Sequence, residues 1–196
     1  ALGHINVDVN DLNVDFLSAS SHKFNGPKGT GFLFIKKGSP IKPFISGGYQ
    51  EKGNRAGTEN VAAVVGMATA LQENVCNIEI HRQMLIEIEN TLIQKLKGYN
   101  LDFIQNGNQN HLPGIVNLSF KGQNGELILH RMDLMGCCIS TGSACDSVSN
   151  QISHVIKAIQ VPKEYAEGTI RISFGKYNTL NDAVDIATMI NSIINK

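Results

Sequence analysis

The apolar residues of this chain switch repeatedly between the two-residue period of a β-strand and the three-to-four-residue period of a helix. Four short runs predict strands, at residues 14–19, 30–36, 116–120 and 170–174. Longer periodic segments predict helices, at about residues 61–71, 78–96, 125–135 and 180–194. Strands interleaved with helices are typical of an α/β chain. The first part has too few strands for a complete sheet, so we expect it to pack against an earlier half of the protein.

Local signals set the ends and faces of these segments. Thr58 or Asn60 is expected to cap the first helix. Within it, the apolar residues Val61, Val64, Val65, Ala68 and Leu71 recur at helical spacing. Gly98 lies where a glycine is expected just beyond the second helix. We expect the strand at 14–19 to be mostly buried and residues 137–139 to form a further short strand.

The chain is predicted to contain two domains. From Gly107 to Gly114 the composition shifts to Gly, Asn and Pro, which is typical of a loop or boundary. We therefore expect one domain in residues 1–106 and another in residues 107–196.

Composition restricts the classes of function. The 196 residues include 17 Lys plus Arg and 17 Asp plus Glu, and this neutrality argues against binding to nucleic acid or an anionic membrane. We expect no membrane span and no signal peptide. The four cysteines suit reduced thiols in the cytoplasm better than a secreted disulfide framework. The chain does not start with Met, and we expect that its beginning has been removed.

The segment from Ser20 to Gly31 carries the strongest chemical signal. Lys23 follows a predicted strand, precedes a turn predicted at Gly26-Pro27-Lys28-Gly29 and is accompanied by His22. A lysine amine can form a Schiff base with an aldehyde cofactor, and Ser and His side chains can donate to its phosphate. The alternative is a solvated lysine in a surface turn. A Walker A phosphate loop does not fit, because no Gly-Lys-Ser/Thr occurs at the required spacing.

Cys145 ends a polar run of small residues, Ser140-Thr141-Gly142-Ser143-Ala144-Cys145. Small residues permit the mobility and exposure that a nucleophilic thiol requires. Cys137 and Cys138 lie in an apolar segment instead, and fit buried structural thiols. No metal is expected, because the cysteines, His130 and His154 lack the Cys-x-x-Cys spacing of a zinc site.

Arg171 and Thr58 are candidate binding residues. The alternation of Ile170, Ile172 and Phe174 turns Arg171 to the opposite face of its strand, and a guanidinium can hold a carboxylate with two parallel hydrogen bonds. Thr58 lies at a predicted helix start, which is a ready anion site. The alternatives are an exposed strand arginine and a threonine that only caps the helix.

Three blocks together resemble a known family: SSHKFNGPKGTGFLFIKKG, the Arg-x-Gly-Thr segment that ends at Thr58, and STGSACDS followed by SHVI. They are similar to segments of the group I NifS/IscS-like cysteine desulfurases, which are class V aminotransferases of pyridoxal-phosphate fold type I. The resemblance implies that Lys23 holds pyridoxal phosphate and that Ser20 and His22 bind its phosphate. It implies that Thr58 reaches the phosphate of a neighbouring subunit.

The resemblance also implies a domain plan. Residues 1–106 would be the end of the cofactor-binding large domain with its linking helices, and residues 107–196 a small C-terminal α+β domain. The N-terminal part of the large domain would be absent. An Asp and a Gln that contact the cofactor in the family find no match, since none of Asp8, Asp11 and Asp15 stands at that position. We therefore expect the chain alone to bind the cofactor weakly and to turn over poorly.

The activity implied by the resemblance is sulfur transfer from L-cysteine to Cys145, as a persulfide, with L-alanine as the product. Arg171 would bind the substrate carboxylate. The implied partners are a second copy in a homodimer and a sulfur acceptor, either an iron–sulfur scaffold or a tRNA-thiolation protein. Two other functions stay open: a non-catalytic module for dimerisation or acceptor docking, and a sister enzyme such as a selenocysteine lyase or an aminotransferase. The Cys145 segment disfavours an ordinary aminotransferase, which needs no such thiol.

Overall fold

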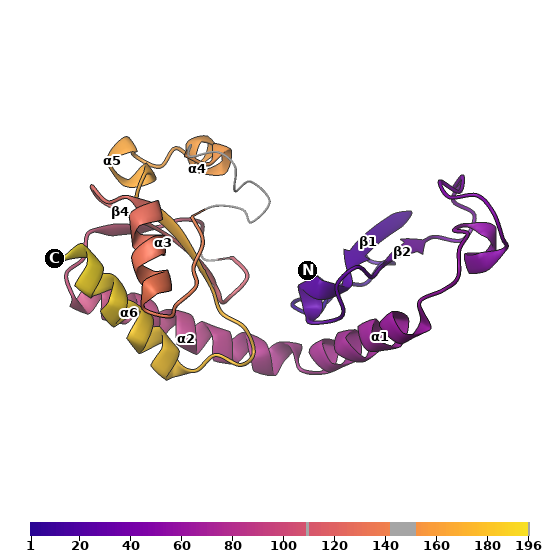
Figure 1. The fold of residues 1–196 in the computed structure, drawn as a ribbon, viewed down its shortest axis with the longest axis horizontal. Helices are drawn as coiled ribbons and strands as arrows, with labels where there is room; N and C mark the ends of the chain where they lie inside the picture. Colours follow the sequence, from indigo (N-terminus) through magenta and orange to yellow (C-terminus); the bar gives the residue numbers. More distant parts are fainter. Residues whose placement is uncertain (109, 142–151, 196) are drawn as a thin grey trace. The chain divides into compact units, whose positions relative to one another are not determined.

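The structure is a computed structural model that describes residues 1–108, 110–141 and 152–195. Its contacts divide the chain into two compact units, Ala1–Ile80 and His81–Lys196 (Figure 1). The sequence predicts a domain boundary between residues 106 and 107. That boundary concerns the domains of the family, and it stays a prediction. Within this chain, packing places most of α2 (Ile78–Gly98) in the second unit, because its buried residues belong to that unit's core.

The first unit is built on a two-stranded antiparallel sheet. β1 (Phe16–Ser20) pairs with β2 (Gly31–Ile35), from Phe16 opposite Ile35 to Ser20 opposite Gly31. The 3-10 helix η1 (Ser21–Phe24) follows β1 and packs against α1 (Val61–Cys76), which comes after a second 3-10 helix, η2 (Gln50–Gly53). Both predicted strands are confirmed. The prediction that the first is mostly buried is wrong: its residues are exposed or half-buried, because β2 is its only strand neighbour among the described residues.

Helix α1 begins where Asn60 caps it. The Asn60 side chain accepts a hydrogen bond from the Ala63 N–H at 3.1 Å, which satisfies a donor of the first turn. Of the two predicted caps, Asn60 is therefore used and Thr58 precedes the helix. The predicted helix is confirmed, although its valines are not buried in this unit. Val61, Val64 and Val65 are exposed, and α1 instead buries Met67 and Asn74, since its packing on η1 involves that side.

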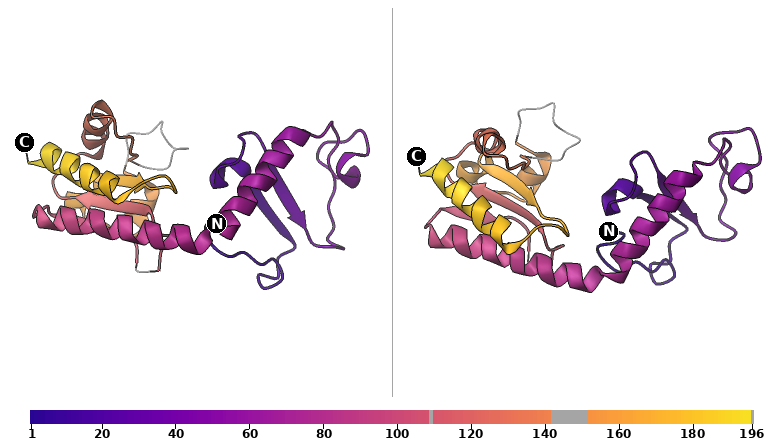
Figure 2. Two further views of the ribbon diagram at one scale, coloured as in Figure 1. Left: turned by 90° about the horizontal axis from the view of Figure 1, so that it is seen from below. Right: turned by 60° about the horizontal axis from the view of Figure 1, so that its bottom comes forward.

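The second unit is a three-stranded antiparallel sheet with helices. After α2 it contains β3 (Phe103–Gln105), β4 (Ile115–Phe120), α3 (Gly125–Leu134), α4 (His154–Ala158), α5 (Lys163–Ala166), β5 (Thr169–Ser173) and α6 (Leu180–Ile194). The strands lie in the order β3-β4-β5, beside α2 and α6 (Figure 2). The predictions for β4, β5, α3 and α6 are confirmed, whereas β3 and α5 were not predicted. Among the described helices none is long and apolar enough to cross a membrane by itself, and α1 and α2 meet that criterion of length and composition only when taken together.

One face of this sheet forms the core. Val116, Leu118 and Phe120 alternate along β4 and are buried, as are Ile170 and Ile172 of β5. They share a cluster with the buried residues of the three long helices, Ile88, Leu92, Leu96, Ile128, Met132, Ala183, Ile186, Ala187, Ile190 and Ile193. Because strand side chains alternate, the residues between them face the other way. The opposite face is therefore polar.

That polar face holds a connected set of hydrogen bonds. Asn106 Nδ2 lies 2.7 Å from Asn117 Oδ1 and 2.7 Å from Ser119 Oγ. Ser119 Oγ lies 2.7 Å from Thr169 Oγ1, which donates to the Ala166 carbonyl oxygen at 2.8 Å. Ser119 and Thr169 are buried, so these bonds satisfy groups that would otherwise be costly to bury.

Two local predictions for the second unit are wrong. Helix α2 runs through Gly98, and Asn100 takes the left-handed conformation with φ 56° just after it, which Asn tolerates better than most residues. Residues 137–139 form no strand. The Cys137 N–H instead bonds to the Met132 carbonyl oxygen at 2.9 Å, at the end of α3, and the first sheet contact of this segment is a single bridge from Ser140 to Arg171.

A buried carboxylate fixes the loop between β3 and β4. Glu89 of α2 accepts hydrogen bonds from Gln105 Nε2 at 2.9 Å and from the Gly114 N–H at 3.2 Å. His111 Nε2 lies 2.7 Å from Glu89 Oε1, and its Nδ1 lies 2.8 Å from the Asn108 carbonyl oxygen. Both partners of His111 only accept hydrogen bonds, so this arrangement requires the protonated imidazolium.

The pKa of His111 follows from these contacts. Burial by itself lowers the pKa, but the hydrogen bonds to Asn108 and Glu89 and the charge of Glu89 outweigh it and raise the pKa above its usual value. A raised pKa in the folded state stabilises the fold fully below the unfolded pKa, about 6.5. This contribution is lost as the pH rises through the folded pKa.

We therefore expect the free energy of unfolding to fall as the pH rises above about 6.5. Glu89→Gln keeps an acceptor but removes the charge, so it should flatten this part of the pH dependence. Urea unfolding followed by circular dichroism between pH 6 and pH 9 measures it. Glu87→Gln changes an exposed carboxylate on the same helix and should leave the wild-type slope. An equal slope for Glu89→Gln and wild type would contradict the assignment.

Candidate functional site

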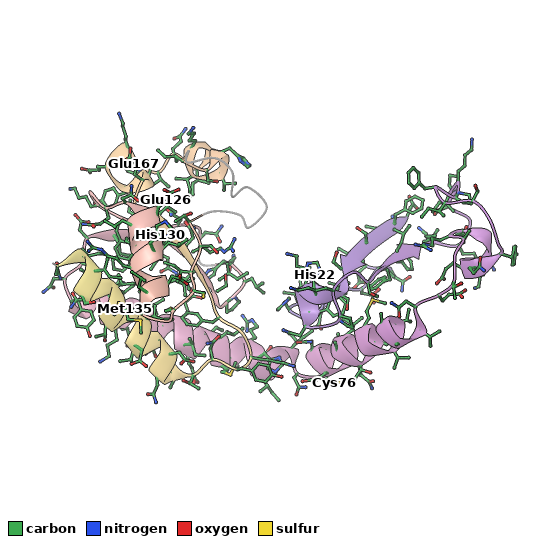
Figure 3. All side chains as sticks on the ribbon, viewed as in Figure 1. His22, Cys76, Glu126, His130, Met135 and Glu167 are labelled. Atoms are coloured by element: carbon green, nitrogen blue, oxygen red, sulfur yellow. The ribbon has the colours of Figure 1, made fainter. Side chains whose placement is uncertain are left out.

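Lys23 lies in η1, immediately after β1. Ser20 is the last residue of β1, and His22 (labelled in Figure 3) and Lys23 are in the 3-10 turn. All three side chains are exposed. The structure thus brings the three predicted residues of the lysine motif onto one strand-to-turn junction, as their closeness in sequence implies.

The backbone of this turn is held from both ends. The Ser21 N–H donates to the Thr30 carbonyl oxygen at 2.9 Å, and the Gly26 N–H donates to the Ser21 carbonyl oxygen at 3.0 Å. Asn25 follows η1 in the left-handed conformation with φ 66°. A Cβ on Gly26 would overlap Ser21 Oγ, so any larger residue there would displace the buried serine side chain. The position of the Lys23 backbone is therefore fixed while its amine is accessible.

Helix α1 also holds the turn that carries Lys23 in place. Asn74 is buried, and its Nδ2 donates to the Phe24 carbonyl oxygen at 2.8 Å and to the Ala70 carbonyl oxygen at 2.7 Å. A Cβ on Gly66 would lie 3.0 Å from Pro27 Cγ, so the helix approaches the turn closely at this glycine. Sequence reasoning missed Asn74. Its only signal was a polar residue at helical spacing from Met67 and Ala70.

Thr58 is exposed in the segment before α1. This segment is held by backbone contacts: the Ala56 N–H donates to the Ile45 carbonyl oxygen at 3.2 Å, and the Gly57 N–H donates to Gln50 Oε1 at 3.2 Å. Thr58 belongs to the same unit as Lys23. Because Asn60 caps the helix, the Thr58 side chain is not needed for that purpose.

Arg171 lies in the middle of β5, on the polar face as predicted. Its backbone N–H donates to the Ser140 carbonyl oxygen at 2.6 Å, and its Nη2 donates to Ser140 Oγ at 3.4 Å. The Arg171 Nε is buried and has no hydrogen-bond partner among the described residues. A buried donor without an acceptor is unfavourable by about 1–3 kcal/mol. A bound carboxylate would supply that acceptor.

The cysteines differ in their surroundings. Cys145 falls outside the described residues, so its predicted role stays a prediction. Cys137 is half-buried, and burial, with smaller effects of Cys138 and Asp182, raises the pKa of its thiol, which makes it a poor nucleophile. Cys138 was predicted to be buried, and this is wrong. It is exposed and its Sγ lies 3.8 Å from Asp133 Oδ1, because the segment leaves the core after Cys137.

No three His, Cys, Asp or Glu side chains within the described parts of the chain gather closely enough to hold a metal ion. His130, on α3 (Figure 3), and His154, at the start of α4, belong to different helices of the second unit. Lys23, Ser20, His22 and Thr58 belong to the first unit and Arg171 to the second. That they act on one substrate is still a prediction.

Comparison with known proteins gives a consistent result. The family model for class-V aminotransferases matches residues 1–186. A cysteine desulfurase IscS from Dictyoglomus turgidum is 44% identical over 196 residues, which cover 100% of this chain and 50% of that protein. A solved NifS-like protein matches with a TM-score of 0.87 and 33% identity, covering 100% of this chain and 50% of that one. A structure described as SspA in complex with cysteine matches with a TM-score of 0.69 and 31% identity, covering 91% and 49%.

The chain thus spans about half the length of the relatives it matches. The structural match confirms the predicted fold class, an α/β chain corresponding to part of the fold of NifS-like proteins.

The contact between Asn74 and Phe24 leads to a prediction. Asn74→Ala leaves the buried Phe24 carbonyl without its donor, so we expect a loss of about 1–3 kcal/mol in the free energy of unfolding. Asn77→Ala is the matched control: its amide bonds to the Glu73 carbonyl oxygen at 2.7 Å but is exposed, and its loss should be under about 1 kcal/mol. Urea unfolding of both variants measures the difference. Equal losses would show that the Asn74 contact does not hold the turn.

Proposed function

Because the chain belongs to the class-V aminotransferase family, we propose that it carries part of the active site of a cysteine desulfurase, which takes sulfur from L-cysteine and leaves L-alanine. The observation that carries this proposal is the Lys23 turn, whose backbone is fixed by Ser21, Gly26 and Asn74 while its amine is exposed. A fixed, accessible lysine beside hydroxyl and imidazole donors is what an aldehyde cofactor with a phosphate requires.

The residues of the turn fit pyridoxal phosphate. Lys23 would hold the cofactor, and Ser20, at the end of β1, and His22, in the turn, present exposed donors for its phosphate. Thr58 adds an exposed hydroxyl in a segment of the same unit. When bound, the cofactor supplies an electron sink for the substrate. The Lys23 amine is the group of this chain that would move protons during the reaction.

Arg171 is proposed to bind the carboxylate of the amino-acid substrate. Its buried Nε lacks an acceptor among the described residues, and a carboxylate that bonds to Nε and one Nη satisfies both donors. The structural relative SspA is described in complex with cysteine, which supports L-cysteine as that substrate here. Cys145 is proposed to take the substrate sulfur as a persulfide.

The partners are proposed on the same basis. The exposed valines of α1, Val61, Val64 and Val65, follow Thr58 and offer an apolar surface for a second copy of the chain, in which Thr58 would reach the neighbouring phosphate. The persulfide sulfur would pass to an acceptor, an iron–sulfur scaffold or a tRNA-thiolation protein. The free thiols of Cys76, Cys137 and Cys138 fit the reducing cytoplasm that we propose as the location.

The proposed cofactor lysine is tested by reduction with borohydride. We expect the active enzyme that contains these residues, mixed with pyridoxal phosphate, to yield an adduct at Lys23 after reduction and peptide mass mapping. Lys23→Ala should lose the adduct, whereas Lys28→Ala, which removes an exposed lysine of the adjoining turn, should retain it. Adducts spread over many lysines in wild type would contradict a specific site at Lys23.

The proposed nucleophile is tested by its sulfur chemistry. In the active enzyme that contains these residues, Cys145→Ser should lower sulfide release from L-cysteine by at least about a hundredfold. The colour of the bound cofactor should be retained, because Cys145 is not needed to hold it. Cys138→Ser removes an exposed thiol of the preceding segment and should release sulfide at the wild-type rate. Undiminished release by Cys145→Ser would contradict the role of Cys145 as the sulfur acceptor.

A further inference from the structure

The backbones of Ser140 and Arg171 form an isolated antiparallel β-bridge with two hydrogen bonds. The Arg171 N–H donates to the Ser140 carbonyl oxygen at 2.6 Å, and the Ser140 N–H donates to the Arg171 carbonyl oxygen at 3.0 Å. Two residues that exchange both backbone hydrogen bonds lie directly opposite each other, with their side chains on the same face. The Ser140 hydroxyl accordingly accepts from Arg171 Nη2 at 3.4 Å.

A contact such as this one with Ser140 favours a single orientation of the Arg171 guanidinium. A free arginine side chain loses rotamer entropy when it is fixed, and a fork that is already oriented loses less of it on binding a carboxylate. On its other side Arg171 is paired with Asn117 of β4. Ser140 is the residue whose side chain bonds to the guanidinium at Nη2, and Nε is left for a ligand.

The segment that carries Ser140 is itself well anchored. Cys137 and Ile139 pack against the core of the second unit, and the Cys137 N–H bonds to the Met132 carbonyl oxygen at the end of α3. The packing of these residues on the core therefore fixes the position of Ser140 opposite Arg171. Along the chain, the same segment then leads to Cys145.

We infer that Ser140 is a positioning residue, which orients the Arg171 guanidinium for a substrate carboxylate. The positioning of Arg171 stands on the contacts just described. Its use in catalysis rests on the proposed function.

The first test needs no substrate. Phenylglyoxal reacts with accessible guanidinium groups, and peptide mapping gives its rate at Arg171 in the 196-residue chain. Ser140→Ala frees Nη2, so Arg171 should react about two- to tenfold faster, the range expected for one hydrogen bond. Ser140→Thr keeps the hydroxyl and should restore the wild-type rate. Ser173→Ala removes an exposed hydroxyl farther along the same strand and should have no effect. An unchanged rate in Ser140→Ala would overturn the inference.

The second test uses the active enzyme that contains this chain. Ser140→Ala should raise KM for L-cysteine by about two- to tenfold with a smaller change in kcat, because the lost contact serves substrate binding. Ser140→Thr should restore KM. If Ser140→Thr fails to restore KM and both variants unfold at lower temperature, Ser140 has only a structural role and the inference is wrong. If the phenylglyoxal rates change as expected but wild type releases no sulfide from L-cysteine, the proposed function fails and the positioning of Arg171 stands.

Discussion

The second unit depends on the pairing of β4 with β5 in one register. In that register Val116 and Leu118 of β4 face the core together with Ile170 and Ile172 of β5. Burial of each such side chain contributes about 1.5–3 kcal/mol, and a slip by one residue would exchange the two faces. The slipped strand would bring Arg171 into the helix-covered core. The hydrophobic pattern therefore places the guanidinium on the polar face of the sheet.

The first unit solves a different problem, since the lysine proposed to hold the cofactor must be accessible on a turn with a fixed backbone. The two-stranded sheet alone gives little burial, and most of its residues are at best half-buried. Rigidity comes from contacts between the turn and distant parts of the chain: Thr30 binds its first residue, and Asn74 binds its last. Ser21 and Phe24, the first and last residues of the turn, are buried, while His22 and Lys23 between them are exposed. The 3-10 geometry thus turns the residues that anchor the turn toward the interior and turns His22 and Lys23 toward solvent.

Sequence reasoning succeeded where the signal is local. The strands around Lys23, the alternation around Arg171 and the amphipathic helix α6 are each defined within one short segment, and the structure places them as predicted. It failed where a distant partner decides. The valines of α1 have the spacing of a buried face, yet the unit buries Met67 and Asn74, because the partner of Asn74 is Phe24, far along the chain. Ser140 likewise reads as the start of a polar loop, and only the fold shows that it meets Arg171.

The hydrogen bonds on the polar face of the sheet have a single direction. Thr169 Oγ1 has one hydrogen, which it gives to the Ala166 carbonyl oxygen, so Ser119 must be the donor in the contact between the two hydroxyls. Ser119 in turn accepts from the Asn106 amide. Every dipole in the row therefore points the same way, from the end of β3 across β4 and β5 to α5, and each bond polarises the next. A residue that can only accept could not replace Ser119, because the row would then be broken at its centre.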